Sequence, residues 1–473
     1  MRLLCFALIL APLLLAQDAG LVLRTLVGYN TTAASTALSP EKKAEVAALA
    51  KQAMSASASG RYGDAIRLLH KGTALMRGVE WTPAVSVAAS LTPTVDHAVW
   101  EPGRKVNLTL KRMYEADEGA PESFTAEVTL RPLPAGQPVK LTSVSKEQTV
   151  LTIPSGITAG AYRVEVTVAP VAQPKPLNIA VAPGARERSE KLAKRLAGIK
   201  APEGPAIATA AYAVELVRGA DRSEIDVSSL DLLREIAYGE ELASALEQGT
   251  NPFASRAGDM RRAYRSRVDD TLQPYRLYVP ASYSKEKPAP LVMALHGMGG
   301  DENTLFDRYK SRVIQDQADK YGYIVAAPKG RGSASMYRGD AERDVMDVVA
   351  DVRSSYNVDA NRIYIMGHSM GGFGSWSIAM NNPEVFAALA PVAGGGNASA
   401  MEKIKHIPQI VFHGDSDKTV NVQQSRGMVE AAKKLGVKVT YIEIPGGGHN
   451  EVFVPAVPQM FEFFNQHRKG KAD

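Results

Sequence analysis

Residues 362–372 read Arg362-Ile-Tyr-Ile-Met-Gly-His-Ser-Met-Gly-Gly372, and this stretch carries the most specific signal in the chain. An apolar run leads into the pattern Gly-x-Ser-x-Gly, and a helix-like segment follows it. The glycines flank Ser369 at a sharp turn from strand to helix, where larger side chains would clash with the backbone. Because such a turn holds the serine hydroxyl clear of the main chain, Ser369 is the candidate nucleophile.

The sequence on both sides of this stretch alternates between apolar runs of strand length and segments of helical spacing, from residue 262 to residue 473. This alternation predicts an α/β domain, with a mostly parallel sheet flanked by helices. Strands are expected at 275–279, 291–295, 323–327, 363–366, 387–392, 409–412 and 439–444, and helices include 340–356, 371–380, 422–435 and 457–467.

A serine nucleophile needs a general base within hydrogen-bond reach and a carboxylate that orients the base. In a sheet of this kind the chain order is serine, then acid, then histidine. The loop after strand 409–412 contains Asp415 and Asp417, and a glycine run after the last strand leads to His449. Since the carboxyl ends of parallel strands share one edge of the sheet, we expect Ser369, one of the two aspartates and His449 to converge there.

The negative charge that forms on a carbonyl oxygen during attack must be met by backbone N–H groups. The glycine-rich loop 296–300 follows strand 291–295, and Met370 directly follows the candidate nucleophile. The N–H groups of Met298 and Met370 are therefore the candidate oxyanion-hole donors. His296 and His368 are expected to be scaffold residues, because neither stands where the base is needed.

The loop 329–339 leaves strand 323–327 at the same edge of the sheet and is expected to border the substrate pocket. Arg331, Tyr337 and Arg338 could contact an anionic or sugar-bearing ligand there. The plainer interpretation is that these side chains are solvated loop residues.

A metal site formed by His413, Asp415 and Asp417 is a further interpretation, because histidine and carboxylate groups are common ligands. No other His or carboxylate motif in the sequence accompanies these three residues. We therefore predict no metal, and chemistry at an activated serine requires no organic cofactor.

The chain has 473 residues, a length that suits about three domains. Its 45% of apolar and 22% of charged residues are typical of a folded globular protein. The balance of 55 Lys and Arg against 50 Asp and Glu gives a net charge of only +5. This charge is too dilute for a nucleic-acid-binding surface unless it is concentrated in a patch, so no nucleic-acid partner is predicted.

The amino terminus has the features of a secretory signal peptide over residues 1–16. Arg2 precedes an apolar run from Leu3 to Ala16 that is too short to span a bilayer. The only cysteine, Cys5, lies inside this run, so cleavage leaves a chain without a thiol. We expect a secreted or periplasmic protein with no stable membrane span after cleavage; an uncleaved anchor or a buried helix is the alternative.

Three further regions precede the α/β domain. Residues 39–80 have helical spacing and predict a helical hairpin. Residues 82–182 alternate with a period of two, which predicts a β-sandwich, and residues 160–164 resemble a late strand of an immunoglobulin-like module. Residues 184–250 return to helical spacing as a linker region, and the arginines between 256 and 267 are expected to lie in a polar linker.

Residues from about 270 to 470 resemble the α/β-hydrolase serine esterases, the group of polyhydroxybutyrate depolymerases, feruloyl esterases and carboxylesterases with "predicted peptidase" relatives. The resemblance rests on the motifs at 295–300, 359–364, 367–372, 413–417 and 448–449. It implies the same nucleophile, base and oxyanion donors. The acid loop of this family has its acid three residues before a valine, which favours Asp417 over Asp415. Some secreted members carry an amino-terminal immunoglobulin-like module, whereas the helical hairpin departs from that pattern.

These features together imply an exported serine hydrolase that cleaves carboxylic esters through an acyl-enzyme. Its partner is expected to be an ester substrate, with a polysaccharide-linked ester and a polyester both open, and no oligomeric state is predicted. Two alternatives stand beside this hypothesis. One is a serine peptidase of the prolyl-oligopeptidase type, and the other is an inactive, hydrolase-like surface protein that binds through its sandwich.

Overall fold

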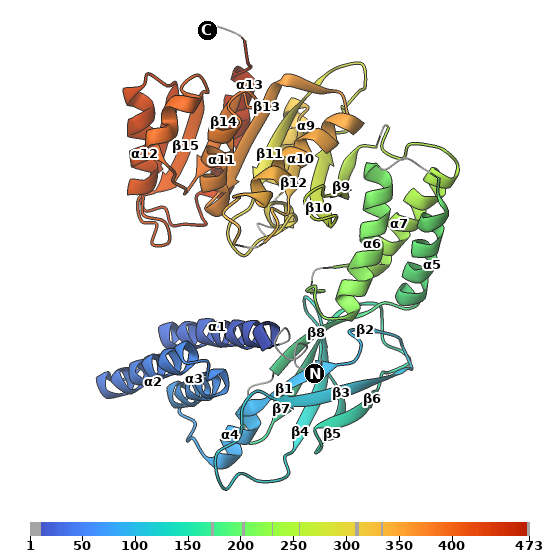
Figure 1. Cartoon of the computed structure of the whole chain (residues 1–473), viewed down its shortest axis with the longest axis vertical. Coiled ribbons are helices and arrows are strands. Elements are labelled where there is room, and N and C mark those ends of the chain that lie inside the picture. Colours follow the sequence, from blue (N-terminus) through green and yellow to red (C-terminus); the bar gives the residue numbers. More distant parts are fainter. Residues whose placement is uncertain are drawn as a thin grey trace, which may run out of the picture. The chain divides into compact units, whose positions relative to one another are not determined.

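The computed structural model describes residues 11–171, 175–200, 204–228, 230–254, 256–307, 312–332 and 334–470, and of residues 11–18 it describes the backbone alone. The chain divides into two compact units, Met1–Ser189 with Leu216–Ile236, and Glu190–Glu215 with Ala237–Asp473. Figure 1 labels most of the elements of both. Each unit has a hydrophobic core of its own, as expected of separate domains.

The first unit opens with α1 (Ala11–Ser35), α2 (Pro40–Ala58) and α3 (Tyr62–Met76). Helix α2 begins where the sequence predicts, because the Ser39 side chain accepts the N–H of Lys42 and Pro40 occupies the first turn. Helices α2 and α3 form the predicted pair. Their packing buries small and aliphatic residues such as Ala53 and Leu69.

Helix α1 adds a third helix that the sequence does not predict. Val22 and Tyr29 are buried in the same core as α2 and α3, and the Tyr29 hydroxyl donates to the Val46 carbonyl at 2.6 Å. The side chain of Tyr29 covers Gly72, where a Cβ atom would lie 2.5 Å from its hydroxyl oxygen. Of the expected signal peptide, residues 1–10 lie outside the described residues, and residues 11–16 form the first turns of α1.

Two sheets follow the short helix α4 (Pro83–Ser90). Their strands are β1 (Leu91–Val95), β2 (Val99–Trp100), β3 (Lys105–Arg112), β4 (Ala126–Pro132), β5 (Val139–Val144), β6 (Gln148–Thr152), β7 (Gly160–Val168) and β8 (Lys175–Val181). One sheet has the order β1-β3-β6 and the other β2-β8-β7-β4-β5. Alternate residues of both sheets, such as Leu108 and Val166, share one apolar core. The immunoglobulin-like assignment of residues 82–182 stays a prediction.

The start of that region differs from the expectation of strands from residue 82. Residues 83–90 form α4, because Pro83 occupies its first turn and the Thr82 side chain accepts the N–H of Val85. Residues 184–250, predicted to be helical, contain α5 (Ala185–Gly198), α6 (Pro205–Asp221) and α7 (Leu232–Glu247).

The second unit contains an eight-stranded sheet of order β16-β15-β14-β13-β11-β12-β10-β9. The strands are β9 (Gly258–Arg265), β10 (Leu272–Val279), β11 (Ala289–Leu295), β12 (Ile324–Pro328), β13 (Val358–His368), β14 (Ala388–Val392), β15 (Gln409–Gly414) and β16 (Val439–Ile444). Strands β11 to β16 pair in parallel, while β10 pairs antiparallel with both β9 and β12. All the strands expected from the sequence are present.

Strand β9 was not predicted, because its arginines suggested a linker. Arg262 is fully buried, with its guanidinium carbon 4.1 Å from the ring centroid of Phe253. Its Nη2 donates to Asp351 at 3.1 Å and to the Ser355 hydroxyl at 2.9 Å. The expectation of a polar linker here is wrong, and the domain begins before residue 262.

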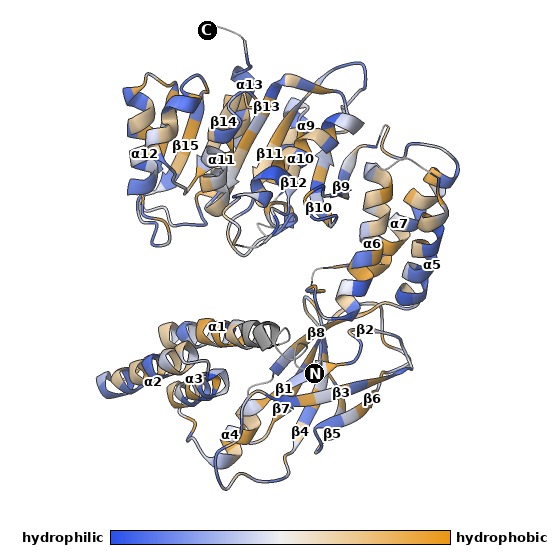
Figure 2. Cartoon of the chain, viewed as in Figure 1, coloured by the Kyte–Doolittle hydropathy of each residue, from blue (hydrophilic) through white to orange (hydrophobic). Residues whose placement is uncertain are grey.

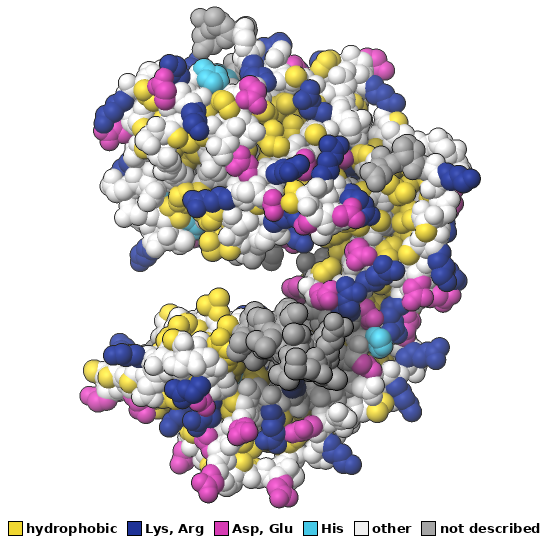
Figure 3. Space-filling model, in the orientation of Figure 1, with side chains coloured by type: hydrophobic (Ala, Val, Ile, Leu, Met, Phe, Trp, Pro, Cys, Tyr) yellow, Lys and Arg dark blue, Asp and Glu magenta, His cyan; other side chains and the backbone are white. Residues whose placement is uncertain are grey.

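Helices cover the sheet: α8 (Thr304–Asp307), α9 (Val313–Tyr321), α10 (Asp340–Ser355), α11 (Met370–Asn381), the 3-10 helix η1 (Ala398–Ile404), α12 (Gln423–Lys434) and α13 (Phe453–Gln466). Figure 2 shows the apolar residues concentrated on the strands. On the face drawn in Figure 3, basic side chains are interspersed with acidic ones. Among the described residues, no helix is both long and apolar enough to cross a bilayer.

Candidate active site

Ser369 stands at the turn between β13 and α11 with φ 56° and ψ −116°. A residue other than glycine adopts this backbone conformation only where its surroundings impose it. The flanking glycines supply the space: a Cβ at Gly371 would lie 2.1 Å from the Leu295 carbonyl oxygen, and a Cβ at Gly367 would lie 2.3 Å from the Gly371 carbonyl oxygen. The structure thus places Ser369 on the strained strand-to-helix turn that the sequence predicts.

The three residues predicted to converge lie together, with His449 within hydrogen-bond distance of both Ser369 and Asp417. His449 Nε2 lies 2.8 Å from Ser369 Oγ, and His449 Nδ1 lies 2.7 Å from Asp417 Oδ2. Asp417 comes from the loop after β15 and His449 from the loop after β16, so three parallel strands carry the three side chains to one edge of the sheet. With a proton on Nδ1, the imidazole presents an unprotonated Nε2 to the serine hydroxyl.

The Asp417 carboxylate is fully buried and well provided with donors. Its Oδ1 accepts the N–H of Thr419 at 2.8 Å and the N–H of Val420 at 2.9 Å. Burial alone raises the pKa of Asp417, but the bonds from His449 and these N–H groups outweigh it, and the net pKa is below the usual value. Asp415 instead is exposed, and its Oδ1 accepts the N–H of Gly446 at 2.7 Å, which ties the loop after β15 to the loop after β16.

Two further histidines contact the cluster formed by these three residues. His413 is fully buried, with Nε2 3.2 Å from Asp417 Oδ2 and 2.9 Å from the Val420 carbonyl oxygen. Since both partners are acceptors, Nε2 carries a proton and donates to them. His368 Nε2 lies 2.8 Å from the His449 carbonyl oxygen and so restrains the backbone of that residue. The sequence suggested His413 only as a metal ligand; its place at the end of β15, four residues before Asp417, was the signal for this contact.

The loop 296–300 runs past the serine. A Cβ at Gly297 would lie 3.4 Å from Ser369 Cβ, so the backbone of the loop passes close to the serine. Met298 follows and is 60% exposed as a residue, whereas Met370 is buried. Met370 opens α11, so its N–H belongs to the first turn, where no preceding carbonyl of the helix accepts it.

Two of the three residues expected at the substrate loop are not available to a ligand. Tyr337 is fully buried, which corrects the expectation that it borders the pocket. The Arg331 guanidinium is 17% exposed, pairs with Asp344 at 2.7 Å and with Asp269, and so is held by carboxylates of its own chain. Arg338 is exposed, as the plainer interpretation holds.

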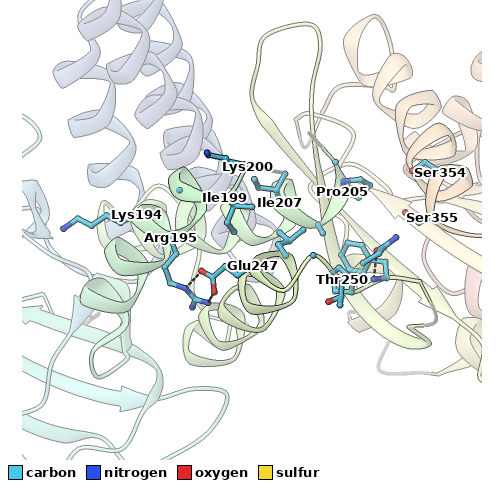
Figure 4. A pocket seen from close by; sticks show the side chains of 18 residues that line it. Lys194, Arg195, Ile199, Lys200, Pro205, Ile207, Glu247, Thr250, Ser354 and Ser355 are labelled. Carbon is cyan, nitrogen blue, oxygen red and sulfur yellow. Dashed lines mark hydrogen bonds and ion pairs between the residues drawn. The ribbon is translucent and has the colours of Figure 1, made fainter. Parts of the chain in front are cut away.

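Within the described part of the chain, no group of three or more His, Cys, Asp or Glu side chains is arranged to hold a metal ion. A groove of about 850 Å³ lies elsewhere in this unit (Figure 4). Residues of α5, α6, α7 and the end of α10 line it, and Ser369, Asp417 and His449 do not.

Comparisons with known proteins found one family match in the carboxy-terminal part. Residues 298–457 match a family model described as "PETase: PET hydrolase-like". The bifunctional acetylxylan esterase/xylanase XynS20E of Neocallimastix patriciarum is 27% identical over 157 residues, 33% of this chain and 23% of that protein. Feruloyl esterase B of Neurospora crassa is 36% identical over 133 residues, 26% of this chain and 44% of that protein. A crystal structure of a thermostable esterase covers 80% of this chain and 100% of its own, at 19% identity and a TM-score of 0.42.

The strand order and the turn at Ser369 give the second unit the α/β-hydrolase fold. The resemblance of its motifs to serine esterases is confirmed by the PET hydrolase-like family match and by the two esterase relatives. The chain spans less than half the length of each of those two relatives.

Proposed function

We propose that this protein is an exported serine hydrolase that cleaves carboxylic esters through an acyl-enzyme, with Ser369 as nucleophile, His449 as general base and acid, and Asp417 as the residue that orients His449. The observation that carries the proposal is the continuous hydrogen-bonded series from Ser369 Oγ through both nitrogens of His449 to Asp417 Oδ2. The family match and the esterase relatives support the same reaction class.

In the first step, Ser369 Oγ attacks the carbonyl carbon of the ester while its proton passes to His449 Nε2. The carbonyl oxygen becomes an oxyanion, which accepts hydrogen bonds from the N–H groups of Met298 and Met370. The tetrahedral intermediate collapses, the ester C–O bond breaks, and the alcohol leaves with the proton from His449. The acyl group is now bonded to Ser369.

In the second step, a water molecule attacks the acyl carbon and gives a proton to His449. The second tetrahedral intermediate releases the carboxylic acid, and the proton on His449 returns to Ser369 Oγ. Asp417 stays ionised throughout, because its lowered pKa keeps the carboxylate able to accept the hydrogen bond from the Nδ1–H of His449 and to stabilise the imidazolium. The cycle balances without a cofactor.

The proposed substrates are esters of the kind that the relatives' names describe, acetylated or feruloylated polysaccharides, with polyesters as a second group suggested by the family description. Export follows from the signal-peptide pattern of residues 1–16. Hydrolysis rates on acetylated xylan, feruloyl sugars, short triglycerides and polyhydroxybutyrate rank these groups of substrates. The amino-terminal sequence of the exported protein shows whether residues 1–16 are removed.

The reaction is tested with Ser369→Ala and hydrolysis of p-nitrophenyl acetate. Loss of the nucleophile is expected to lower turnover by about 10⁴ to 10⁶-fold and to abolish labelling by a fluorophosphonate probe. Ser377→Ala is the matched control, because its hydroxyl lies on the same helix and donates to the Gly374 carbonyl at 3.3 Å. Unchanged turnover in Ser369→Ala contradicts the proposal.

The same preparation separates the alternatives. Faster hydrolysis of peptide p-nitroanilides than of matched esters indicates a peptidase, because the same residues can cleave amides. A wild-type protein that neither turns over esters nor reacts with the fluorophosphonate indicates an inactive binding protein.

A further inference from the structure

The loop 329–339, which connects β12 to α10, is bonded twice to the residue that begins the candidate oxyanion loop. The Lys329 carbonyl oxygen lies 2.9 Å from His296 Nε2. The Tyr337 hydroxyl accepts the N–H of His296 at 3.0 Å and lies 3.5 Å from the carbonyl oxygen of the same residue. The main chain and the side chain of His296 are therefore both restrained by this loop.

The ring of Tyr337 has a close-fitting site of its own. It is fully buried and packs at 5.6 Å, centroid to centroid, on the ring of His296. A Cβ at Gly330 would lie 2.6 Å from Tyr337 Cε1, and a Cβ at Gly374 would lie 2.8 Å from Cδ2. The two glycines thus make room for the ring, and their positions leave it little freedom to move.

The neighbouring residue contacts the other side of the proposed oxyanion hole. The N–H of Met336 lies 3.3 Å from Sδ of Met370. Met336 and Tyr337 have φ values of 53° and 49°, which non-glycine residues adopt only where the surrounding structure imposes them. One strained segment therefore contacts Met370 directly and Met298 through His296.

The loop is also anchored at Arg331. Its Nη2 donates to the Ser266 hydroxyl at 2.6 Å, and its guanidinium pairs with Asp344 at 2.7 Å and with Asp269. Ser266 and Asp269 follow β9, and Asp344 lies on α10. The position of Tyr337 is thus fixed by elements outside the oxyanion loop.

The oxyanion loop has glycines at 297, 299 and 300, which offer no side chain to hold it. The loop 329–339 therefore adds to the restraint that comes from the loop's own bonds, from the Gly300 N–H to the Gly297 carbonyl at 3.1 Å and from His296 Nδ1 to the same carbonyl at 2.8 Å. We propose that Tyr337 is a positioning residue: its hydroxyl fixes the His296 peptide and thereby holds the N–H of Met298 where the oxyanion forms. The inference rests on the proposed function and adds to it a residue that touches neither substrate nor the reacting atoms.

Tyr337→Phe tests this inference, since it removes one buried oxygen atom and keeps the ring. The kcat for p-nitrophenyl acetate is expected to fall by about 10- to 100-fold, because small displacements of transition-state donors have effects of this size. KM is expected to stay within about 2-fold. The affinity for phenylboronic acid, whose adduct with a serine presents a charged oxygen to the oxyanion hole, should fall by the same factor as kcat/KM.

The matched control is Tyr364→Phe. Tyr364 is also fully buried, lies five residues before Ser369, and donates its hydroxyl proton to the His467 carbonyl at 2.6 Å. This variant should lose thermal stability to a similar extent while its kcat and boronate affinity remain those of the wild type. Gly330→Ala gives a second route, because its new Cβ pushes on the Tyr337 ring and should reproduce the loss of kcat.

Three results are decisive. An active wild type with Tyr337→Phe and Gly330→Ala both within about 2-fold of its kcat and boronate affinity overturns the inference. Equal losses of kcat in Tyr337→Phe and Tyr364→Phe overturn it as well, since they indicate general destabilisation. A wild type without esterase activity or fluorophosphonate labelling overturns the proposed function instead.

Discussion

Asp417 is the residue that orients His449 in the proposed relay. Its carboxylate is buried, a position in which the protonated form is normally favoured. The donors from His449, Thr419 and Val420 reverse that preference and lower its pKa. The ionised form of the Asp417 carboxyl group is therefore more stable, relative to the protonated form, in the folded chain than in the unfolded one.

This difference predicts a pH dependence of stability. Since the folded pKa lies below the unfolded value of about 3.8, ionised Asp417 stabilises the fold fully above that value, and the contribution is lost as the pH falls through the folded pKa. Asp417→Asn is expected to lower the free energy of unfolding by about 1–3 kcal/mol at pH 6. In urea unfolding between pH 6 and pH 2.5, the gap between wild type and variant should narrow below pH 4; a constant gap contradicts this account.

Residues with a strong local signature were predictable from the sequence. The glycines around Ser369 and before His449 mark turns that only small residues permit, so both residues were found without the structure. Choosing Asp417 over Asp415 required the family resemblance, because both stand in the same loop. The burial of Tyr337 could not be predicted from the sequence, because part of the space for its ring is left by Gly374, which is distant in the sequence.

At the scale of elements, β9 is the edge strand that completes the sheet. It carries Arg262 into the interior, where Asp351 and Ser355 of α10 accept its hydrogen bonds and Phe253 lies under its guanidinium. The helix and the edge strand are thereby joined by a buried ion pair.

Breaking this pair is expected to be costly, because Asp351 is left with a poorly solvated charge. Arg262→Met should lower the free energy of unfolding by about 3 kcal/mol, measured by urea denaturation. Arg265→Met on the same strand is the control: its pair with Asp270 is exposed on both sides, so its effect should be within about 0.5 kcal/mol. Similar values for the two variants contradict this view of β9.

The elements that the sequence predicted share an uninterrupted apolar run or a cap. Strands β11, β12 and β14 are buried along their whole length, so their sequences are apolar throughout. The sequence of β9 contains arginines, and the stretch that forms α4 has alternating apolar residues, so their local patterns indicated the wrong structure. In both places tertiary contacts or a single capping residue outweighed periodicity.

At the scale of the whole molecule, the boundary of the second unit differs from the one expected at residue 262. The unit includes residues 190–215 and starts again at residue 237, and its sheet begins at Gly258. A chain that starts at residue 262 lacks half of β9. It also lacks Phe253, whose ring lies under the guanidinium of Arg262.

We therefore expect two fragments to behave differently. Residues 190–473, which also include residues 216–236 of the first unit, keep the whole core of the sheet, so they should give a folded protein with esterase activity within a few-fold of the full chain. Residues 262–473 should aggregate or melt at a lower temperature, because Arg262 no longer packs on the ring of Phe253. Gel filtration and thermal melts of both fragments decide the matter, and equal behaviour of the two fragments contradicts a domain boundary before residue 262.

The strand order also determines when each strand gains its pairing partners during synthesis on the ribosome. Strand β11, buried along its whole length in the finished sheet, pairs with β12 on one side and with β13 on the other. Its second partner emerges only after residue 358 has been translated. The last helix, α13, contacts α9, and the ring of Phe461 packs 5.5 Å from that of Tyr323. The nascent chain therefore carries an apolar strand with one unpaired edge until β13 has been translated, and such an edge favours aggregation during that interval.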